Sequence, residues 1–395
     1  MGKNRVYKEN NMRILYYTWY ENSQKDMSES LSRLGHEVIC CHIPFSNYER
    51  DDQFTELLEK TFIEYNCDCF LSFDFFPLIA KSADYLKKIY ISCVYDTPHL
   101  TVFSPSVQSN YVKLFVFDKI LYERVKEKKS IGLFHMPLAV NVQRLDELLN
   151  SANNEYVDEI SFVGSLYENN IYRKILYIPE YIRGYLEGII FAQQKIYGYN
   201  FVEEVIPENI NLELQKYIKL ELDESYGVST NYLYANMINA EITARDREDL
   251  LEAAADIGKV TLYSASKFGG SKKIEEKGII DYQNGMSKVF RNSKINLNIT
   301  LRSITSGIPL RALDIMGAGG FLLSNYQPEL AEYFVDGEDM VLFDSVQDMC
   351  RKLNYYLKHE EERKKIARNG YEKIKKKFSY DVQIRKIVQL AIGDK

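Results

Sequence analysis

Short apolar runs alternate with amphipathic segments along the first part of the chain. The segments between the runs, such as residues 23–35 and 51–66, have helical spacing and lengths that suit crossover connections. This alternation predicts a parallel, doubly wound α/β sheet over residues 1–155. The runs that predict its strands are "MRILYYT", "HEVICCHI", "CFLSFDF", "YISCVYD", "KLFVFD" and "IGLFHM".

A second pattern of the same kind follows a polar stretch at residues 150–159, where we place a domain boundary after residue 155. It begins with "ISFVGS" and is interrupted over about residues 170–256, which are rich in helix formers and aromatics and predict a helical insertion. Residues 156–378 therefore predict a second Rossmann-like α/β domain. Its further strand signals are "KVTLYS", "GIIDY", "KINLNIT", "GFLLSN" and "MVLF".

Composition agrees with two domains and narrows the class of partner. The chain has 395 residues, 46% of them hydrophobic, which exceeds what one core usually holds. The net charge of −6 argues against nucleic-acid binding, which relies on clustered Lys and Arg. The six cysteines, mostly within apolar runs, indicate reduced core residues. With no apolar run of about 20 residues and no signal peptide, we expect no transmembrane segment and a cytoplasmic location.

Two features of the sequence could suggest an anion-binding surface or a metal site, and neither is favoured. The lysine-rich segment 360–378, "EEERKKIARNGYEKIKKKF", also contains acidic residues, so a solvated helix face is favoured over an anion-binding surface. Cys67 and Cys69 have no second Cys or His pair at ligand spacing, and Asp118 in "FDKILYERV" is a single acid. The sequence therefore predicts no metal site.

The loop after "KINLNIT" suggests an anion site. Ser306 and Gly307 precede a helix that begins near Pro309, so their backbone amides are expected to be free at the positive end of the helix dipole. Asp314, inside that helix, can accept hydrogen bonds from a ribose diol, as acids do in dinucleotide sites. The alternative is a local ion pair with Arg311, three residues earlier.

The segment "SGIPLRALDIMGAGGFLLSNYQPELAEYFVDGEDMVLFDS" resembles the nucleotide-sugar-binding segment of GT-B glycosyltransferases. That family has an acid, seven other residues and a glutamate on a helix. Asp314 stands at the second acid, which in the family contacts ribose. Ser306 stands where the first acid contacts the donor sugar, so this chain departs from the pattern there.

Further blocks, in order, resemble CgeB-like, spore-maturation-type glycosyltransferases over nearly the whole chain. This resemblance implies a bacterial GT-B enzyme that takes a nucleoside-diphosphate sugar and passes the sugar to an acceptor protein or a cell-surface, spore or flagellar glycan. It also implies that residues 379–395 return to the first domain. The blocks include "YISCVYDTPHLTVFS", "HMPLAVN", "ISFVGSLYENN", "DREDLLEAAADIGKVTLYS" and "MSKVFRNSKINLNIT".

The same resemblance assigns roles around the donor. It places the nucleobase at Tyr263 and Ser264, the ribose at Asp314 and the sugar at Ser306, and the diphosphate would lie at the free amides of Ser306 and Gly307. Without a metal, the diphosphate charge would be offset by the helix dipole and by Arg311, with Arg302 and Lys288 as further options.

Strand ends of the first domain supply the acceptor-side candidates. Asp96 and His99, in "VYDTPH", could act as the general base of an inverting transfer, although Asp96-Thr97-Pro98 could equally cap a helix. Asp74 ends the preceding strand and is a weaker candidate. Trp19 and Tyr20 could stack on a sugar or pack in the core.

We expect His135 either to line the hinge side of a cleft between the two predicted domains or to be a satisfied core histidine. Two other functions remain open from the sequence. The two-sheet architecture also suits a sugar-nucleotide epimerase, and the missing acid at Ser306 suits a catalytically silent sugar-nucleotide-binding scaffold.

Overall fold

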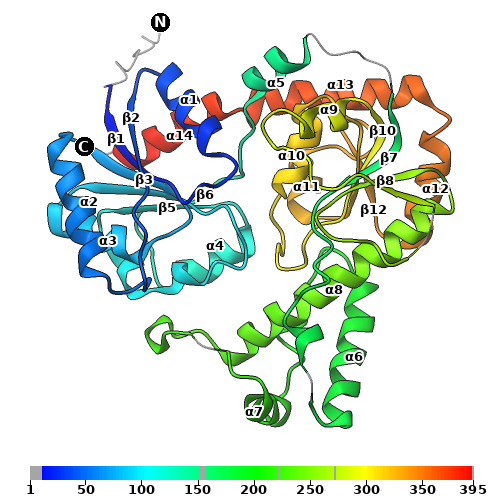
Figure 1. Ribbon diagram of the computed structural model, residues 1–395, viewed down its shortest axis with the longest axis horizontal. Helices are drawn as coiled ribbons and strands as arrows, with labels where there is room; N and C mark the ends of the chain where they lie inside the picture. The colour runs from blue at the N-terminus through cyan, green and yellow to red at the C-terminus, as the bar shows by residue number, and fades with distance from the viewer. Residues whose placement is uncertain (1–10, 151–155, 176, 221, 271–272, 394–395) are drawn as a thin grey trace, which may run out of the picture. The chain divides into compact units, whose positions relative to one another are not determined.

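The computed structural model describes residues 11–150, 156–175, 177–220, 222–270 and 273–393. These residues form two compact units (Figure 1). The first contains the chain up to Val116, Val125–Phe134 and the residues from Ile384 onward, and the second contains Phe117–Arg124 and His135–Gln383. The domain boundary predicted after residue 155 falls at the end of segment 151–155, which lies outside the described residues.

The first unit is built on a six-stranded sheet with the order β2-β1-β3-β4-β5-β6. Neighbouring strands from β2 to β5 pair in parallel, as the alternation of apolar runs predicts. Each predicted run overlaps one strand, which confirms the α/β fold of this part. The strands are β1 (Arg13–Tyr17), β2 (Glu37–Cys41), β3 (Cys69–Phe73), β4 (Ile89–Cys93), β5 (Val112–Val116) and β6 (Leu133–His135).

Helices α1 (Gln24–Arg33), α2 (Asp52–Glu64) and α3 (Pro77–Leu86) cover the two faces of this sheet (Figure 1). In α2 the apolar spacing predicts the buried face, which consists of Phe54, Leu58 and Phe62, and the Asp51 carboxylate caps its first turn by accepting the Phe54 amide at 3.0 Å. The expectation that the cysteines lie in the core fails at Cys40, which is exposed because β2 is an edge strand.

The second unit contains another six-stranded sheet, with the order β12-β11-β10-β7-β8-β9 and parallel pairing throughout. One predicted strand is wrong: "GIIDY" is irregular, and the edge strand β9 lies a few residues earlier. The strands are β7 (Asp158–Val163), β8 (Val260–Tyr263), β9 (Ile274–Glu276), β10 (Ser293–Asn298), β11 (Leu322–Asn325) and β12 (Val341–Phe343).

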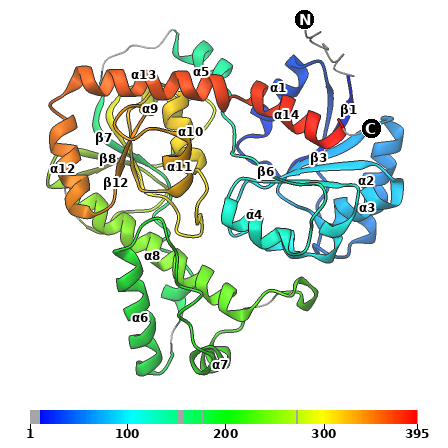
Figure 2. The ribbon, with the colours of Figure 1, turned by 180° about the vertical axis from the view of Figure 1, so that it is seen from behind.

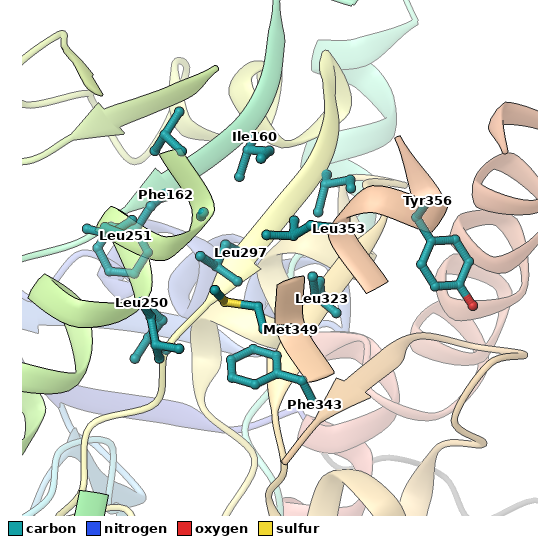
Figure 3. Packing of buried hydrophobic residues seen from close by; sticks show 14 of the residues in the cluster. Ile160, Phe162, Leu250, Leu251, Leu297, Leu323, Phe343, Met349, Leu353 and Tyr356 are labelled. Atoms are coloured by element: carbon teal, nitrogen blue, oxygen red, sulfur yellow. The ribbon is translucent and has the colours of Figure 1, made fainter. Parts of the chain in front are cut away.

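The core of this sheet combines apolar side chains from the strands with those of two helices, α8 (Thr230–Ala255) and α12 (Val346–Tyr356). Ile160 and Leu297 are fully buried on neighbouring strands, and Leu251 and Met349 close over them from α8 and α12 (Figure 3). Continuous apolar strands are expected where both faces of a parallel sheet are covered. The other helices of the chain are α4 (Lys119–Lys126), α5 (Val142–Leu149), α9 (Met286–Arg291), α10 (Leu310–Gly317), α11 (Pro328–Tyr333), α13 (Glu360–Lys377) and α14 (Tyr380–Ile392).

Between β7 and β8 the chain is helical, with α6 (Glu180–Gln194) and α7 (Glu208–Tyr217) preceding α8. Figure 2 shows α6 beside the first half of α8, and the two helices are in contact. A separate apolar cluster forms here, in which Ile182 of α6 and Ile238 of α8 are fully buried. Helix α8 therefore takes part in two cores, first with α6 and then with the sheet.

We expect Ile238→Ala to lower the free energy of unfolding by about 2–5 kcal/mol, because it leaves a cavity between α6 and α8. Guanidinium unfolding followed by circular dichroism measures this loss. The control is Phe191→Ala, which removes a larger but exposed side chain from α6 and should change stability by less than about 0.5 kcal/mol. Equal losses in the two variants would contradict the second core.

Candidate functional site

Parallel sheets usually bind ligands at the carboxyl ends of their strands. At this edge of the second sheet, Arg247 of α8 lies between the ends of β7 and β10. Its Nη2 donates to the carbonyl of Ile299 at 2.8 Å, and its Nη1 donates to the carbonyl of Ser165. The guanidinium is also within 5.3 Å of the Phe162 ring centroid and 5.0 Å of the Tyr167 ring centroid.

Arg247 is a buried cation without an acidic hydrogen-bond partner among the described residues. It is 9% exposed, and its Nε has no hydrogen-bond partner there. Burial lowers its pKa to about 10, a net value that includes a smaller lowering by the positive charge of Arg311 and an opposing effect of Tyr167 and Asp246. A bound anion would supply the missing countercharge, because a guanidinium can donate to several oxygens at once.

Arg311 and Asp314 occupy the first turns of α10, which follows β10. The Arg311 Nη1 lies 3.7 Å from the Asp314 Oδ2, so the local ion pair considered from the sequence is present. The Tyr282 hydroxyl also lies 3.5 Å from the Asp314 Oδ1. Asp314 is 8% exposed and Arg311 keeps about a quarter of its side chain in contact with water. Its role at a ribose stays a prediction.

The expectation of free amides at Ser306 and Gly307 is wrong. The Oδ2 of Asp118 accepts the amides of Thr305, Ser306 and Gly307 at 2.8, 2.9 and 3.0 Å. In the sequence, Asp118 stands at the end of an apolar run and at the start of "FDKILYERV", and neither pattern indicates that it would reach this loop. Because these amides already donate to a carboxylate of the protein, they are not available to bind a diphosphate.

Ser306, at the position of the missing acid, is buried between the carboxylates of Asp118 and Glu329. Its hydroxyl donates to the Glu329 Oε1 at 2.7 Å, and Glu329 also accepts the Lys119 amide at 2.8 Å. The second oxygen of Glu329 lies 2.8 Å from the His135 Nε2. Burial opposes protonation of His135, but the hydrogen bond and charge of Glu329 raise its pKa overall. His135 therefore has a polar partner within the second unit.

The remaining predicted donor residues are dispersed around this edge. Arg302 is engaged by Asp246, with 2.6 Å between Nε and Oδ2, and donates to the Ile196 carbonyl at 2.7 Å. Its charge is thus already compensated, and we leave it out of the proposed site. The exposed Lys288 lies on α9. Tyr263 and Ser264 end β8, where the Tyr263 hydroxyl donates to Asp158 at 2.9 Å and the Ser264 hydroxyl accepts the Ser266 amide at 3.1 Å.

In the first unit the structure brings Asp74, Asp96 and His99 together at the ends of β3 and β4. The Asp74 Oδ1 accepts the amides of Tyr95 and Asp96 at 2.9 and 3.1 Å, and it lies 3.8 Å from the His99 Nδ1. The other ring nitrogen of His99 is 2.7 Å from the Thr101 hydroxyl. Both nitrogens of His99 therefore face protein groups, and the imidazole links the two strand ends.

Asp96 has the more unusual protonation equilibrium. Its side chain remains accessible to water, but crowding by protein atoms and the negative charge of Asp74 raise its pKa to about 6, with His99 opposing. Its backbone amide donates a hydrogen bond to Asp74. The next helical turn, Leu100–Phe103, has His99 at its N-cap position and no side-chain cap, so the Asp96 carboxylate does not cap it as the alternative interpretation requires. An acid with this pKa can accept a proton near neutral pH.

Trp19 and Tyr20 follow β1, the strand beside β3. Tyr20 is 70% exposed and has a φ of 67°. The centroids of the Tyr20 and His42 rings are 4.3 Å apart. The Trp19 indole nitrogen is buried and has no partner among the described residues. The loop is fixed by the buried Glu21, which accepts the Thr18 hydroxyl at 3.0 Å and the Trp19 amide at 3.1 Å.

Two properties of the described residues bear on the class of site. No three His, Cys, Asp or Glu side chains among them gather closely enough to hold a metal ion. Of the helices in these segments, none combines the length and apolar character needed to cross a bilayer. Arg247 and Asp118 are the groups that sequence reasoning missed. In the sequence, Arg247 stands beside Asp246 in "ARDRED", and neighbouring arginines and acids of this kind are too common in helices to indicate a site residue.

Comparisons with known proteins agree with this architecture. Residues 245–389 match the family described as glycosyl transferase-like, while curated proteins give no significant match. Sucrose-phosphate synthase from Thermosynechococcus elongatus superposes with a TM-score of 0.57 at 10% identity, covering 98% of this chain and 100% of that chain. A UDP-forming α,α-trehalose-phosphate synthase from Burkholderia xenovorans gives 0.53 at 10% identity, covering 97% and 99%.

A third solved structure, Anabaena HepE in complex with UDP, gives a TM-score of 0.51 at 7% identity and covers 96% of this chain and 99% of that chain. At such identities the likeness establishes the fold. The chain therefore has the GT-B fold of glycosyltransferases, with a glycosyl transferase-like sequence over residues 245–389.

Proposed function

We propose that this protein is a metal-independent glycosyltransferase of the CgeB-like type, which moves a sugar from a nucleoside diphosphate to an acceptor. The observation that carries the proposal is Arg247, a buried cation whose uncompensated charge lies at the carboxyl edge of the second sheet. The glycosyl transferase-like match begins two residues before it. Two solved structures of the same fold, the UDP-forming trehalose-phosphate synthase and HepE in complex with UDP, make UDP the first nucleotide to test.

In this proposal the second unit holds the nucleotide. Arg247 and Arg311 neutralise the diphosphate, and their charges already disfavour each other in its absence. Asp314 then accepts the ribose hydroxyls, and Tyr263 with Ser264 borders the base. As the glycosidic bond breaks, negative charge grows on the leaving diphosphate, so fixed guanidinium groups stabilise the transition state more than the ground state.

The first unit supplies the base. Asp96 removes the proton from the acceptor hydroxyl as that oxygen attacks the anomeric carbon. Asp74 and His99 position it, since Asp74 binds the Asp96 amide and lies beside the His99 ring. The exposed ring of Tyr20 and the indole of Trp19, whose nitrogen lacks a protein partner, offer stacking and hydrogen bonding to an acceptor sugar.

A silent sugar-nucleotide-binding scaffold is the second candidate, favoured by one observation. Ser306, in place of an acid that would contact the donor sugar, already hydrogen-bonds Glu329. Calorimetry with UDP, ADP and GDP, followed by turnover of the corresponding sugar nucleotides in EDTA, separates the two. Donor hydrolysis or transfer supports the enzyme and its metal independence. Binding without turnover over many acceptors supports the scaffold, and no nucleotide binding contradicts both.

We expect Arg247→Met and Asp314→Ala each to weaken binding of the preferred nucleotide by about 1.5–3 kcal/mol, because each removes charge-assisted hydrogen bonds. Calorimetry measures the change, and Glu361→Ala, at an exposed acid of α13, serves as the control.

Arg302→Met provides a second comparison, this time of protein stability, for the Arg247→Met variant. It strands the buried Asp246 charge and should cost about 3–5 kcal/mol of stability, more than Arg247→Met, which leaves no acid unpaired. Wild-type nucleotide affinity in both Arg247→Met and Asp314→Ala would contradict the donor site.

We expect Asp96→Asn to lower turnover by about 10²–10⁴-fold with little change in nucleotide affinity, because the amide cannot accept the acceptor proton. In the wild type, turnover should rise with pH through about 6, since the raised pKa keeps part of Asp96 protonated below that value. Steady-state rates between pH 4.5 and 8 measure both effects. A wild-type rate in Asp96→Asn would show that Asp96 is structural.

A further inference from the structure

The second unit contains a large groove at the opposite edge of its sheet, where the strands begin. It has a volume of about 910 Å³ and lies between the end of α5, the turn from α10 to β11, and α13. Its lining includes Ser293, the first residue of β10, and Phe321, just before β11. The groove is therefore separate from the carboxyl edge proposed for the donor.

Cations line this groove in excess, and they fall into two groups. The lysines have acidic partners: Lys294 pairs with Glu159, Lys364 with Glu360, and Lys375 with Asp146. Three arginines, Arg291, Arg363 and Arg368, have no ion pair with a carboxylate in the described residues. Ordinary surface charges of a solvated helix are compensated like the lysines, so the arginines need another explanation.

Arg363 is the most unusual of the three. It is 2% exposed, donates through Nη1 to the Tyr356 carbonyl and lies 5.6 Å from the Tyr156 ring centroid. Its Nε has no partner among the described residues. A buried guanidinium with a free donor is costly unless an anion binds it. Helix α13 thus places an unsatisfied cation in the wall of the groove.

Arg291 reaches the same groove from α9 across a glycine turn. Its Nη1 lies 3.4 Å from the Ala318 carbonyl, and a side chain at Gly319, which has a φ of 73°, would collide with that nitrogen. Glycine therefore suits the left-handed backbone of this turn, and its missing side chain leaves the space that the Arg291 guanidinium occupies. Arg368 is on the surface of α13, with no hydrogen bond or ion pair to other described residues.

We propose that this groove binds the phosphate group of a phosphorylated compound. Planar guanidinium groups match phosphate oxygens in pairs, and three of them around one groove exceed what a single carboxylate ligand would need. The apolar parts of Leu149, Tyr156 and Phe321 leave room for an uncharged portion of the same compound. This proposal does not depend on the proposed function.

The test uses the full chain and two probes, inorganic pyrophosphate by calorimetry and phosphatidylglycerol vesicles by co-sedimentation, with phosphatidylcholine vesicles as reference. The variant is Arg291→Gln with Arg368→Gln, which changes two exposed arginines and spares the core. The matched control is Lys365→Gln, an exposed cation of α13 outside the groove. We expect the double variant to weaken binding about tenfold or more and the control to leave it unchanged.

Each outcome identifies a source or overturns the proposal. Loss of pyrophosphate binding in the double variant, with retention in Arg247→Met, assigns a free phosphorylated compound to the groove. Loss of vesicle binding alone assigns a lipid headgroup. The proposal is overturned if neither probe binds the wild type, if the double variant binds like the wild type, or if only Arg247→Met loses pyrophosphate.

Discussion

The continuity of α8 is the constraint on which the second unit depends. This helix runs for 26 residues, with Ile238 in the core shared with α6 and Leu251 in the core of the sheet. Between the two cores, Asp246 and Arg247 point to different strand ends. Asp246 binds Arg302 in the loop after β10, and Arg247 binds the carbonyls that follow β7 and β10. A break in α8 would therefore disturb both cores and the proposed donor edge.

In the first unit, two carboxylates, Asp74 and Asp96, lie close together at the strand ends. Asp74 is buried but well supplied with hydrogen bonds, since it accepts two backbone amides. Asp96 lies beside it, and crowding by protein atoms together with the negative charge of Asp74 raises the pKa of Asp96. Neighbouring carboxylates in unequal surroundings can thus separate into a positioning group and a proton acceptor.

The alternation of apolar runs was sufficient to predict both sheets, because strands covered on two faces must be continuously apolar. "GIIDY" failed because a short apolar run does not distinguish an edge strand from a packed loop. Site residues were harder to predict. Asp96 and Asp74 could be found because strand ends in a parallel sheet converge on one edge. The Asp118 contact and the uncompensated charge of Arg247 could not, since each depends on which distant groups pack nearby.

The Asp118 carboxylate also has a consequence for the order in which the chain folds. It fixes the loop before α10 through three amides, yet Asp118 and Thr305 are 187 positions apart in the sequence. Contacts between such distant positions form late, because closing a long stretch of chain costs entropy before the contact can stabilise it. We therefore expect the turn that leads into α10 to acquire its final shape late in folding, after the local strand and helix contacts on either side of it.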